Sequence, residues 1–587
     1  MKTSEIRSRF VAFFERYGHE HLPSGSLVPT DDPTLLFTNA GMVQFKSAFQ
    51  GEREPPAPRA VTVQKCLRVS GKHNDLEEVG RTARHHTFFE MLGNFSFGDY
   101  FKEDAIRFAW EFVTADLGLE PERLWATVHR DDDEAHELWL ELSELPESRV
   151  LRLGDAENFW QMGEMGPCGP CSELHYDLRP PSASERLDPE AFVAAGEADR
   201  FMEIWNLVFM QFDRDAQGID RPLPAPSIDT GAGLERIAAI LQDRRTNYHT
   251  DLFLPIIREA ERLLGMEYST DPERWDEGLS FRVLADHARA VAFLLADGVF
   301  PSAEGRGYVL RRILRRAARH AWLRGRREPT LDRLVDVVVE QMGDTYPELE
   351  SRREHLTETT RAEEERFLAT IDEGMQRFEE IAPIPEDGVT DRAAEEGTFA
   401  GAETPPAGSA IGEGDATIAG RDAFRLYDTY GFPLDLTQLM ARERGYRVDV
   451  EGFETALEEQ RRRSRADREA AVHEAGGGER FAELESEAEQ EFVGYDRIRV
   501  ETPVLAAASE DGRGAVLLER NPFYAESGGQ VSDTGVVEGP GFRLRVERVL
   551  SNEVGQTVVA GPLVEGTLPE EPGEVEARVS ESERRDT

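Results

Sequence analysis

Residues 84–93 carry the sequence Arg84-His85-His86-Thr87-Phe88-Phe89-Glu90-Met91-Leu92-Gly93, in which two aromatic side chains follow a cluster of cationic and polar groups. Upstream lies Cys66-Leu67-Arg68, and a polar loop, Lys72-His73-Asn74-Asp75, stands between the two segments. Arginine binds phosphate through paired N–H donors, and an aromatic ring offers a face on which a nucleotide base stacks. Residues 66–93 therefore predict a site for a triphosphate and its base.

A second motif occupies residues 227–236, with the sequence Ser227-Ile228-Asp229-Thr230-Gly231-Ala232-Gly233-Leu234-Glu235-Arg236. Its two glycines permit close approach of a ligand to the backbone, and Arg236 opens the next predicted helix. The motif is not a dinucleotide-binding fingerprint, because Arg236 stands where a third glycine is needed. It indicates a ligand site without identifying the ligand.

Residues 306–327 contain nine arginines and no carboxylate, although carboxylates are frequent elsewhere in the chain. Apolar residues recur in this segment at helical spacing and are expected to face a core. The arginines expected to form a stripe on the other side are Arg312, Arg315, Arg316 and Arg319. Because the guanidinium fork suits phosphate, the stripe favours contact with RNA. The alternative is a solvated helix face paired with acidic neighbours.

The overall charge is strongly negative, with 68 basic and 114 acidic residues in 587 and a formal net charge of −46. Lysine is scarce and arginine abundant, and the acidic residues are spread along the whole chain. In 1 M salt, repulsion between such charges is screened to within about 3 Å. We interpret the composition as adaptation to salt, with an ordinary acidic protein as the alternative.

Cysteines and apolar runs bear on the cellular compartment. Cys66, Cys168 and Cys171 are too few for a disulfide scaffold. No stretch of about 18 uncharged apolar residues occurs, so no membrane partner is expected. A cytoplasmic location is predicted.

A chain of this length is expected to form three or four domains. Up to residue 240, short apolar runs alternate with helical stretches, which predicts an α+β domain around an antiparallel sheet. The expected segments are a sheet domain at 1–240, a helical domain at 241–384, an acidic Gly/Ala/Pro-rich loop or linker at 385–422, a continuation of the helical region at 423–475 and a small β-barrel at 476–587.

Four further blocks stand in order along the chain, at residues 37–42, 87–100, 205–212 and 427–433. Together with the two motifs, they closely resemble the alanyl-tRNA synthetase family of bacterial type over essentially the whole length. The resemblance implies a class II aminoacyl-tRNA synthetase core with an antiparallel sheet, then a helical tRNA-recognition domain and a small β-barrel. It also implies an enzyme that uses ATP with Mg²⁺ to form alanyl-adenylate and then transfers alanine to tRNA(Ala).

The resemblance assigns roles to individual residues. Arg68 is expected to hold the α-phosphate and the amino-acid carboxylate, and Arg236 the terminal phosphates, so these two are the expected catalytic residues. Phe89 is expected to stack on adenine. Further ATP contacts are expected from His73, Asp75, Arg84, Gly231 and Gly233. Asp229 is expected to bind the alanine ammonium, and the residues expected to shape the methyl pocket are Trp160, Asn206 and Val208.

In the helical region the resemblance implies a surface that recognises a G·U wobble pair in the tRNA acceptor stem. Its expected members are Asp428, Arg306, Arg312, Arg315, Arg316 and Arg319. Many relatives carry asparagine where this chain has Ala303, at a position linked to wobble-pair recognition. Either Asp428 carries more of the discrimination here, or a neighbour substitutes for the asparagine.

The sequence Cys168-Gly169-Pro170-Cys171 raises the question of zinc. A structural zinc site needs four ligands, and only His175 is an obvious third. The Gly-Pro repeats favour a rigid structural turn near the substrate pocket, so no metal site is expected within this sequence.

A methyl-sized pocket cannot strongly exclude glycine or serine, since one methylene is worth only about 1–3 kcal/mol. The family has a hydrolytic editing region for this purpose, and residues 521–530 resemble its opening. Relatives continue into histidines that bind Zn²⁺, whereas this sequence ends at Arg584-Arg585-Asp586-Thr587. We expect a carboxy-terminally truncated chain that charges tRNA but does not hydrolyse Ser-tRNA or Gly-tRNA. Oligomer formation by the intact protein stays open.

Two other classes of function are alternatives for this sequence. A non-catalytic tRNA-binding paralogue predicts damaged motifs, whereas Arg68, Asp229 and Arg236 are intact. An acidic helical interaction protein leaves the ordered run of motifs unexplained. ATP-dependent attachment of alanine to tRNA is therefore the leading hypothesis.

Overall fold

A computed structural model describes residues 1–29, 35–70, 73–76, 78–162, 165–180, 186–215, 217–302, 304–383, 417–460, 484, 486, 488, 490–494, 497–510, 512–524, 533–552, 556–569 and 573–580. The chain forms two compact units, Met1–Asp449 and Val450–Thr587. Most of the linker predicted at 385–422 lies outside the described residues, which resume at residue 417. The division after Asp449 falls inside the helical continuation predicted at 423–475.

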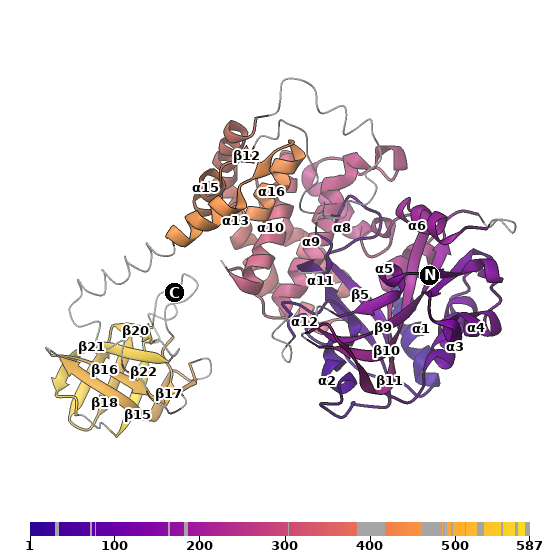
Figure 1. The fold of residues 1–587 in the computed structure, drawn as a ribbon. Coiled ribbons are helices and arrows are strands. Elements are labelled where there is room, and N and C mark those ends of the chain that lie inside the picture. Colours follow the sequence, from indigo (N-terminus) through magenta and orange to yellow (C-terminus); the bar gives the residue numbers. More distant parts are fainter. Residues whose placement is uncertain are drawn as a thin grey trace. The chain divides into compact units, whose positions relative to one another are not determined.

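A nine-stranded sheet lies at the centre of the first 240 residues, with strand order β1-β2-β5-β11-β10-β9-β6-β7 and with β8 paired to β9 (Figure 1). The strands are β1 (Glu20–His21), β2 (Arg59–Leu67), β5 (Phe88–Ser96), β6 (Leu124–His129), β7 (Val150–Leu153), β8 (Phe159–Gln161), β9 (Gly166–Asp177), β10 (Phe201–Arg214) and β11 (Asp220–Gly233). Only the edge pairs β1–β2 and β6–β7 are parallel among these pairings. The predicted α+β core is confirmed as a mixed sheet that is antiparallel throughout its middle.

Successive side chains along each strand point to opposite faces of this sheet. On β10, Trp205, Leu207 and Phe209 point into a core built with helices. Asn206 and Val208 point to the opposite face, which is hollowed. The helices and short strands that accompany the sheet are α1 (Thr3–Arg16), α2 (Lys46–Phe49), β3 (Val69–Ser70), β4 (His73–Asn74), α3 (Lys102–Glu111), α4 (Asp133–Leu142), α5 (Asp155–Asn158), α6 (Pro189–Glu197) and α7 (Leu234–Leu241).

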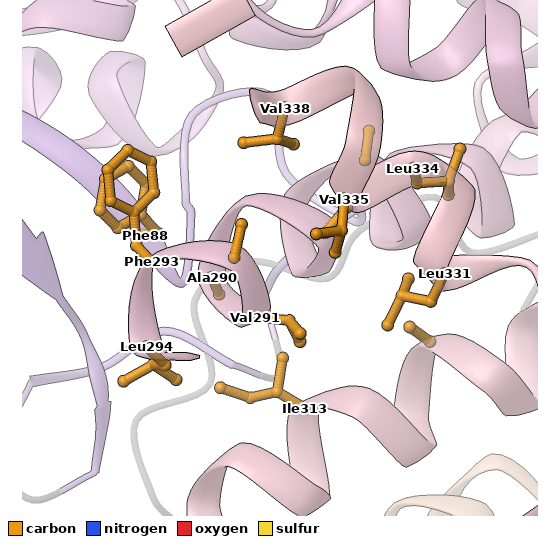
Figure 2. Packing of buried hydrophobic residues seen from close by; sticks show 14 of the residues in the cluster. Phe88, Ala290, Val291, Phe293, Leu294, Ile313, Leu331, Leu334, Val335 and Val338 are labelled. Carbon is orange, nitrogen blue, oxygen red and sulfur yellow. The ribbon is translucent and has the colours of Figure 1, made fainter. Parts of the chain in front are cut away.

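The predicted helical region follows. Its elements are α8 (Leu254–Leu264), α9 (Leu279–Ala296), α10 (Gly305–Leu323), α11 (Leu331–Met342), α12 (Pro347–Ser351), α13 (Arg353–Ile381), β12 (Thr417–Ile418), α15 (Gly420–Tyr430), α16 (Leu434–Glu443) and β13 (Arg447–Val448). Helix α9 is buried on all sides, from residue 280 to residue 296. Its Phe293 stacks on Phe88 of β5 with ring centroids 4.1 Å apart, within an apolar cluster that joins the sheet to the helices (Figure 2).

Unit 2 contains the predicted small barrel. Its sheet runs β16-β15-β22-β18-β19-β21-β20, and a further pairing of β16 with β21 closes six of these strands into a ring. The strands are β14 (Glu491–Phe492), β15 (Arg499–Glu510), β16 (Arg513–Leu518), β17 (Arg520–Asn521), β18 (Gly535–Gly539), β19 (Phe542–Val546), β20 (Arg548–Ser551), β21 (Thr557–Gly566) and β22 (Glu574–Val579). Valine and leucine side chains fill its interior. Across the described ranges of both units, every helix is too short or too polar to cross a bilayer.

Candidate active site

The hollowed face of the sheet is built from side chains that lie next to one another on three neighbouring strands. Asn206 of β10 is paired with Glu173 of β9 on one side and with Gly231 of β11 on the other. The Nδ2 of Asn206 donates a 3.0 Å hydrogen bond to Glu173 Oε1. At Gly231 a Cβ would stand 2.8 Å from the Sδ of Met91, so the absent side chain keeps this part of the face open.

One pleat further along β10, Val208 is paired with Asp229 of β11. The carboxylate of Asp229 is buried and has no ion-pair partner within the described part of the chain. Burial raises the pKa of Asp229 to about 7. A cation placed beside this carboxylate would restore its ionised form. Val208 and Trp160 belong to the apolar cluster on this face.

Arg68 and Phe89 form a second part of the face. Arg68 follows β2 directly, and Phe89 is the second residue of β5. The guanidinium of Arg68 lies 5.0 Å from the centroid of the Phe89 ring, and its Nε donates to the carbonyl oxygen of Asn39. The pairing of β2 with β5 therefore brings the predicted phosphate ligand and the predicted base platform into contact.

Arg236, at the start of α7, is held by Glu203 of β10. Its Nη1 donates to Glu203 Oε2 at 2.7 Å and to the carbonyl oxygen of Glu203 at 2.9 Å. Burial acts to raise the pKa of Glu203, but the guanidinium of Arg236 lowers it to about 2. The ion pair thus keeps Arg236 directed at the face and charged.

Three other groups have pKa values shifted by burial. Burial raises the pKa of Asp75, although Arg68 and Arg236 oppose the shift. Burial and the charge of Arg236 lower the pKa of His85 to about 3, so its imidazole is neutral at physiological pH. The pKa of Arg84 is also lowered by burial and by Arg236.

These groups line one cavity of about 190 Å³. The predicted site residues that line it are Arg68, Asp75, Arg84, Phe89, Trp160, Asn206, Val208, Asp229, Gly231, Gly233 and Arg236. The side chain of His73 lies outside the described residues. The residues predicted to bind the nucleotide and those predicted to bind the amino acid lie far apart in the sequence. The fold therefore brings them together in one cavity.

The structure adds cavity residues that the sequence reasoning did not single out: Ala40, His85, His86, Met91, Glu203, Glu235 and Asn247. Most of them lie inside the quoted motifs or blocks, so their positions in those segments could have indicated them. Glu203 and Asn247 lie outside those segments and had no such signal. The β9–β10 register shifts between Glu203 and Trp205, so period-two counting from Asn206 does not assign Glu203 to the cavity face.

A buried hydrogen-bonded chain runs from the cavity wall into the helical region. Asn247 Nδ2 donates to His86 Nε2 at 2.9 Å, and His86 Nδ1 donates to Asp286 Oδ2 at 3.1 Å. His287 Nδ1 donates to Asp286 Oδ1 at 3.0 Å and accepts from Arg316 at its Nε2, at 2.9 Å. Burial lowers the pKa of His287 to about 4, which agrees with an imidazole that accepts at Nε2 from the Arg316 guanidinium.

The expected exposed stripe of arginines on α10 is wrong for three of its members. Arg315, Arg316 and Arg319 are only 6%, 3% and 5% exposed. Arg315 donates to Glu363 Oε1 at 2.6 Å, and Arg316 donates to the carbonyl oxygen of Val79 and to His287. The guanidinium groups of Arg315 and Arg316 serve the packing of α10, because buried N–H donors need acceptors and neighbouring elements supply them here.

Arg306 and Arg312, which are half-buried, also bond to backbone oxygens. Arg306 Nε donates to Leu36 at 2.7 Å, and Arg312 donates to Val69. Asp428 of α15 is exposed, and it borders a recess of about 180 Å³ between α10 and α15. Ala303 lies outside the described residues.

Cys168 and Cys171 lie in β9, so the expectation of a turn there is wrong. The strand continues through the Gly-Pro repeats because the β9–β10 register shifts between Val208 and Phe212. A Cβ at Gly169 would stand 2.1 Å from the carbonyl oxygen of Phe209, so only glycine fits this close approach. Across the described ranges, no group of three His, Cys, Asp or Glu side chains is placed to hold a metal ion. Residues 525–530 of the segment that resembles the editing region lie outside those ranges.

Comparison with protein families matches residues 5–389 and 408–583 to the family described as tRNA synthetases class II (A). The chain is 49% identical over 570 residues to an alanine–tRNA ligase of Stenotrophomonas maltophilia, covering 93% of this chain and 59% of that protein. It is 47% identical over 584 residues to an alanine–tRNA ligase of Magnetococcus marinus, covering 97% of this chain and 62% of that protein. The chain thus spans about three fifths of the length of these curated relatives.

Proposed function

This chain belongs to the class II tRNA synthetase family, and from that premise we propose that it catalyses ATP-dependent attachment of alanine to tRNA(Ala) through an alanyl-adenylate. The observation that carries the proposal is the set of residues that line one cavity. It combines Asp229, a buried carboxylate suited to an ammonium group, with Arg68, Phe89 and Arg236, which are suited to a nucleoside triphosphate. Activation of an amino acid requires both ligands to bind side by side.

The amino-acid end of the cavity fits alanine. The ammonium group pairs with Asp229, and the methyl group contacts the apolar side chains of Val208 and Trp160. The amide of Asn206, oriented by Glu173, completes the wall. Serine and glycine differ from alanine by too little to be strongly excluded by such a wall.

The nucleotide end fits ATP, with Mg²⁺ entering as part of the substrate. Phe89 stacks on adenine, Arg236 binds the terminal phosphates, and Arg68 lies between the α-phosphate and the alanine carboxylate. An alanine carboxylate oxygen forms a bond to the α-phosphorus while the bond to pyrophosphate breaks. The guanidinium groups stabilise the negative charge that gathers during this step.

Transfer of alanine to the terminal ribose requires a surface for the acceptor stem. We place that surface near Asp428 and the recess between α10 and α15, with Arg306 and Arg312 on the same helix as its flank. The buried Arg315, Arg316 and Arg319 support this surface from inside rather than by reaching phosphates. In this division, residues 1–240 serve adenylation and the helical region serves tRNA.

The cellular setting belongs to the same proposal. The many acidic residues and the scarcity of lysine support a salt-adapted source. The presence of only three cysteines supports work in a reducing cytoplasm.

The test is alanine-dependent ATP–pyrophosphate exchange in high salt, with the unmodified chain, Arg68→Ala and Asp229→Ala. Exchange with alanine that both substitutions abolish supports the proposal. Asp131→Ala is a matched control, since Asp131 is exposed and lies outside the cavity. A folded chain that binds tRNA but shows no exchange with alanine, serine or glycine contradicts the proposal and favours a non-catalytic tRNA-binding protein.

A further inference from the structure

Arg289 of α9 is fully buried behind the wall of the cavity. Its Nη2 donates to Glu235 Oε1 at 2.6 Å and lies 3.9 Å from Glu90 Oε2. The guanidinium also lies 5.1 Å from the ring centroid of Phe88 and 4.6 Å from that of Phe253. A planar cation between two rings and two carboxylates has little freedom to move.

Each carboxylate of this pair is the chain neighbour of a residue proposed to bind ATP. Glu235 directly precedes Arg236, and Glu90 directly follows Phe89. Because side chains alternate along β5, Phe89 faces the cavity while Glu90 points behind the sheet. Arg289 does not itself line the cavity, and it contacts the two segments that carry Phe89 and Arg236 through Glu90 and through Glu235, a residue of the cavity wall.

Glu235 also links these two segments directly. Both oxygens of its carboxylate accept from the backbone N–H of Glu90, at 3.2 Å each. The first turn of α7 is thus tied to the beginning of β5 through one carboxylate, and Arg289 supplies the charge that balances that carboxylate. Without Arg289, Glu235 would be a buried anion whose guanidinium partner is missing.

The charges in this cluster balance. Arg7 of α1 holds Glu90 with two hydrogen bonds of 2.7 and 2.5 Å, and the hydroxyl of Tyr346 donates to Glu90 at 2.7 Å. Two carboxylates thus face two guanidinium groups. Although burial acts to raise the pKa of Glu90, Arg7 holds it below its usual value. Glu90 is fixed on one side by Arg7, so Arg289 acts chiefly on Glu235.

We infer that Arg289 is a positioning residue that sets the spacing between Phe89 and Arg236, and through that spacing the affinity of the site for ATP. The inference rests on the proposed function, since it takes Phe89 as the platform for the base and Arg236 as the ligand of the terminal phosphates. At the alanine end of the cavity, Asp229 lies on β11 and Val208 on β10, and neither residue is bonded to Arg289. ATP binding should therefore depend on Arg289 while alanine binding does not.

The same helix offers a matched control. Arg282 of α9 is 1% exposed, its Nε donates to the carbonyl oxygen of Gly80 at 2.7 Å, and its guanidinium lies 3.5 Å from the ring centroid of Trp275. It is as buried as Arg289 and also rests on an aromatic ring. Unlike Arg289, it has no ion pair with Glu235 or Glu90 among the described residues.

The experiment compares the unmodified chain with Arg289→Lys and Arg282→Lys. The dissociation constant of Mg·ATP is measured by calorimetry in the absence of alanine, and KM for ATP and for alanine by pyrophosphate exchange. We expect Arg289→Lys to raise the ATP dissociation constant and KM at least tenfold, with KM for alanine changed less than twofold. Arg282→Lys should lower the melting temperature comparably and leave both ATP constants within twofold.

Equal loss of ATP and alanine affinity, or equal effects of the two substitutions, overturns the inference. If Arg289→Lys does not fold, Glu235→Gln probes the same link from its other end and should produce the same selective rise for ATP. Failure of the unmodified chain to bind ATP contradicts the proposed function instead. The two failures are therefore distinguishable.

Discussion

The guanidinium of Arg236 is held by the carboxylate of Glu203, with 2.7 Å between Nη1 and Oε2. Glu203 lies on β10 and Arg236 on α7, so the pair ties a sheet strand to the helix that follows the neighbouring strand. The bond orients a cation toward the cavity before any ligand arrives. Such preorganisation reduces the cost of ordering the site when the phosphates bind.

Glu203→Gln is expected to raise KM for ATP about tenfold. The substitution keeps a hydrogen-bond acceptor but removes the charge, and a charge-assisted bond contributes about 1.5–3 kcal/mol, with the lower end apt for a partly exposed carboxylate. Pyrophosphate exchange at varied ATP measures the effect, with the exposed Glu190→Gln as control. A fall in KM would mean that Glu203 competes with phosphate rather than orienting Arg236.

Asp229→Asn is expected to raise KM for alanine at least a hundredfold while the dissociation constant for Mg·ATP stays within twofold. Asparagine has nearly the same shape but cannot pair with an ammonium group, and truncating one side of a buried charged contact costs about 2–5 kcal/mol. Exchange at varied alanine and calorimetry with ATP give the two constants. Comparable weakening of ATP binding would place Asp229 at the nucleotide instead.

The pH dependence of alanine use should follow Asp229, whose pKa burial raises to about 7. Below pH 7 the free enzyme carries a protonated Asp229, which cannot pair with the alanine ammonium. We therefore expect kcat/KM for alanine to fall about tenfold per pH unit below 7 and to level off above it. His85 stays neutral through this range, since its pKa is about 3. A flat profile between pH 5 and 8 would falsify the assignment of Asp229 to the ammonium group.

Asp286→Asn is expected to destabilise unit 1 by about 3 kcal/mol, because a buried carboxylate that accepts from His86, Thr87 and His287 loses its charge. Its pKa lies well below the ordinary value of 3.8 despite burial, through the bonds from His287 and His86. The stabilisation is therefore complete above about pH 5 and is lost as pH falls below the ordinary value. Denaturant titrations at pH 7 and pH 3 should show a smaller difference in unfolding free energy between variant and parent at the lower pH, because pH 3 lies below the ordinary value. A difference in stability that does not change with pH would contradict the attribution to the charge of Asp286.

The substitutions Arg316→Gln and Asp428→Asn should distinguish a residue that stabilises the fold from a residue that faces RNA. Arg316 is buried and bonded to His287, so its loss should reduce stability by about 3 kcal/mol even without RNA. Asp428 is exposed, so its loss should change stability by less than about 0.5 kcal/mol. Only Asp428→Asn should leave pyrophosphate exchange intact while lowering the charging of tRNA(Ala). If Arg316→Gln is as stable as the parent but binds tRNA weakly, Arg316 faces RNA and the structural role assigned to it is wrong.

Much of the fold and of the cavity could be predicted from short-range patterns. Glycine spacing and aromatic pairs are local, so the motifs around Phe89 and Gly231 were recognisable as ligand sites, and the structure brings their residues into one cavity. The barrel was predicted because strand-like runs separated by glycine and proline also form a local pattern. In each case the sequence pattern on which the prediction rests is contained in a segment of about ten residues.

The rest depends on contacts between distant segments. The arginines of α10 are distributed like an exposed stripe, and only the packing of α10 against α9 and α13 shows that Arg315 and Arg316 are buried among acceptors. Glu203 faces the cavity because of a register shift that no periodicity contains. Asp286 is 200 residues from its partner His86, so sequence spacing gives no reason to connect them.

The stacked rings of Phe88 and Phe293 have a consequence for dissecting the molecule. Residues of β2 and β5 share one apolar cluster with helices α8 to α13, so the sheet and these helices exclude water jointly. A fragment cut near residue 240 would expose its half of that cluster and leave Glu90 and Glu235 without Arg289. The sheet is therefore not an autonomous module. It should melt together with α9 in a single cooperative transition, and the shortest piece that folds should extend at least through Leu356, the last residue of the shared cluster.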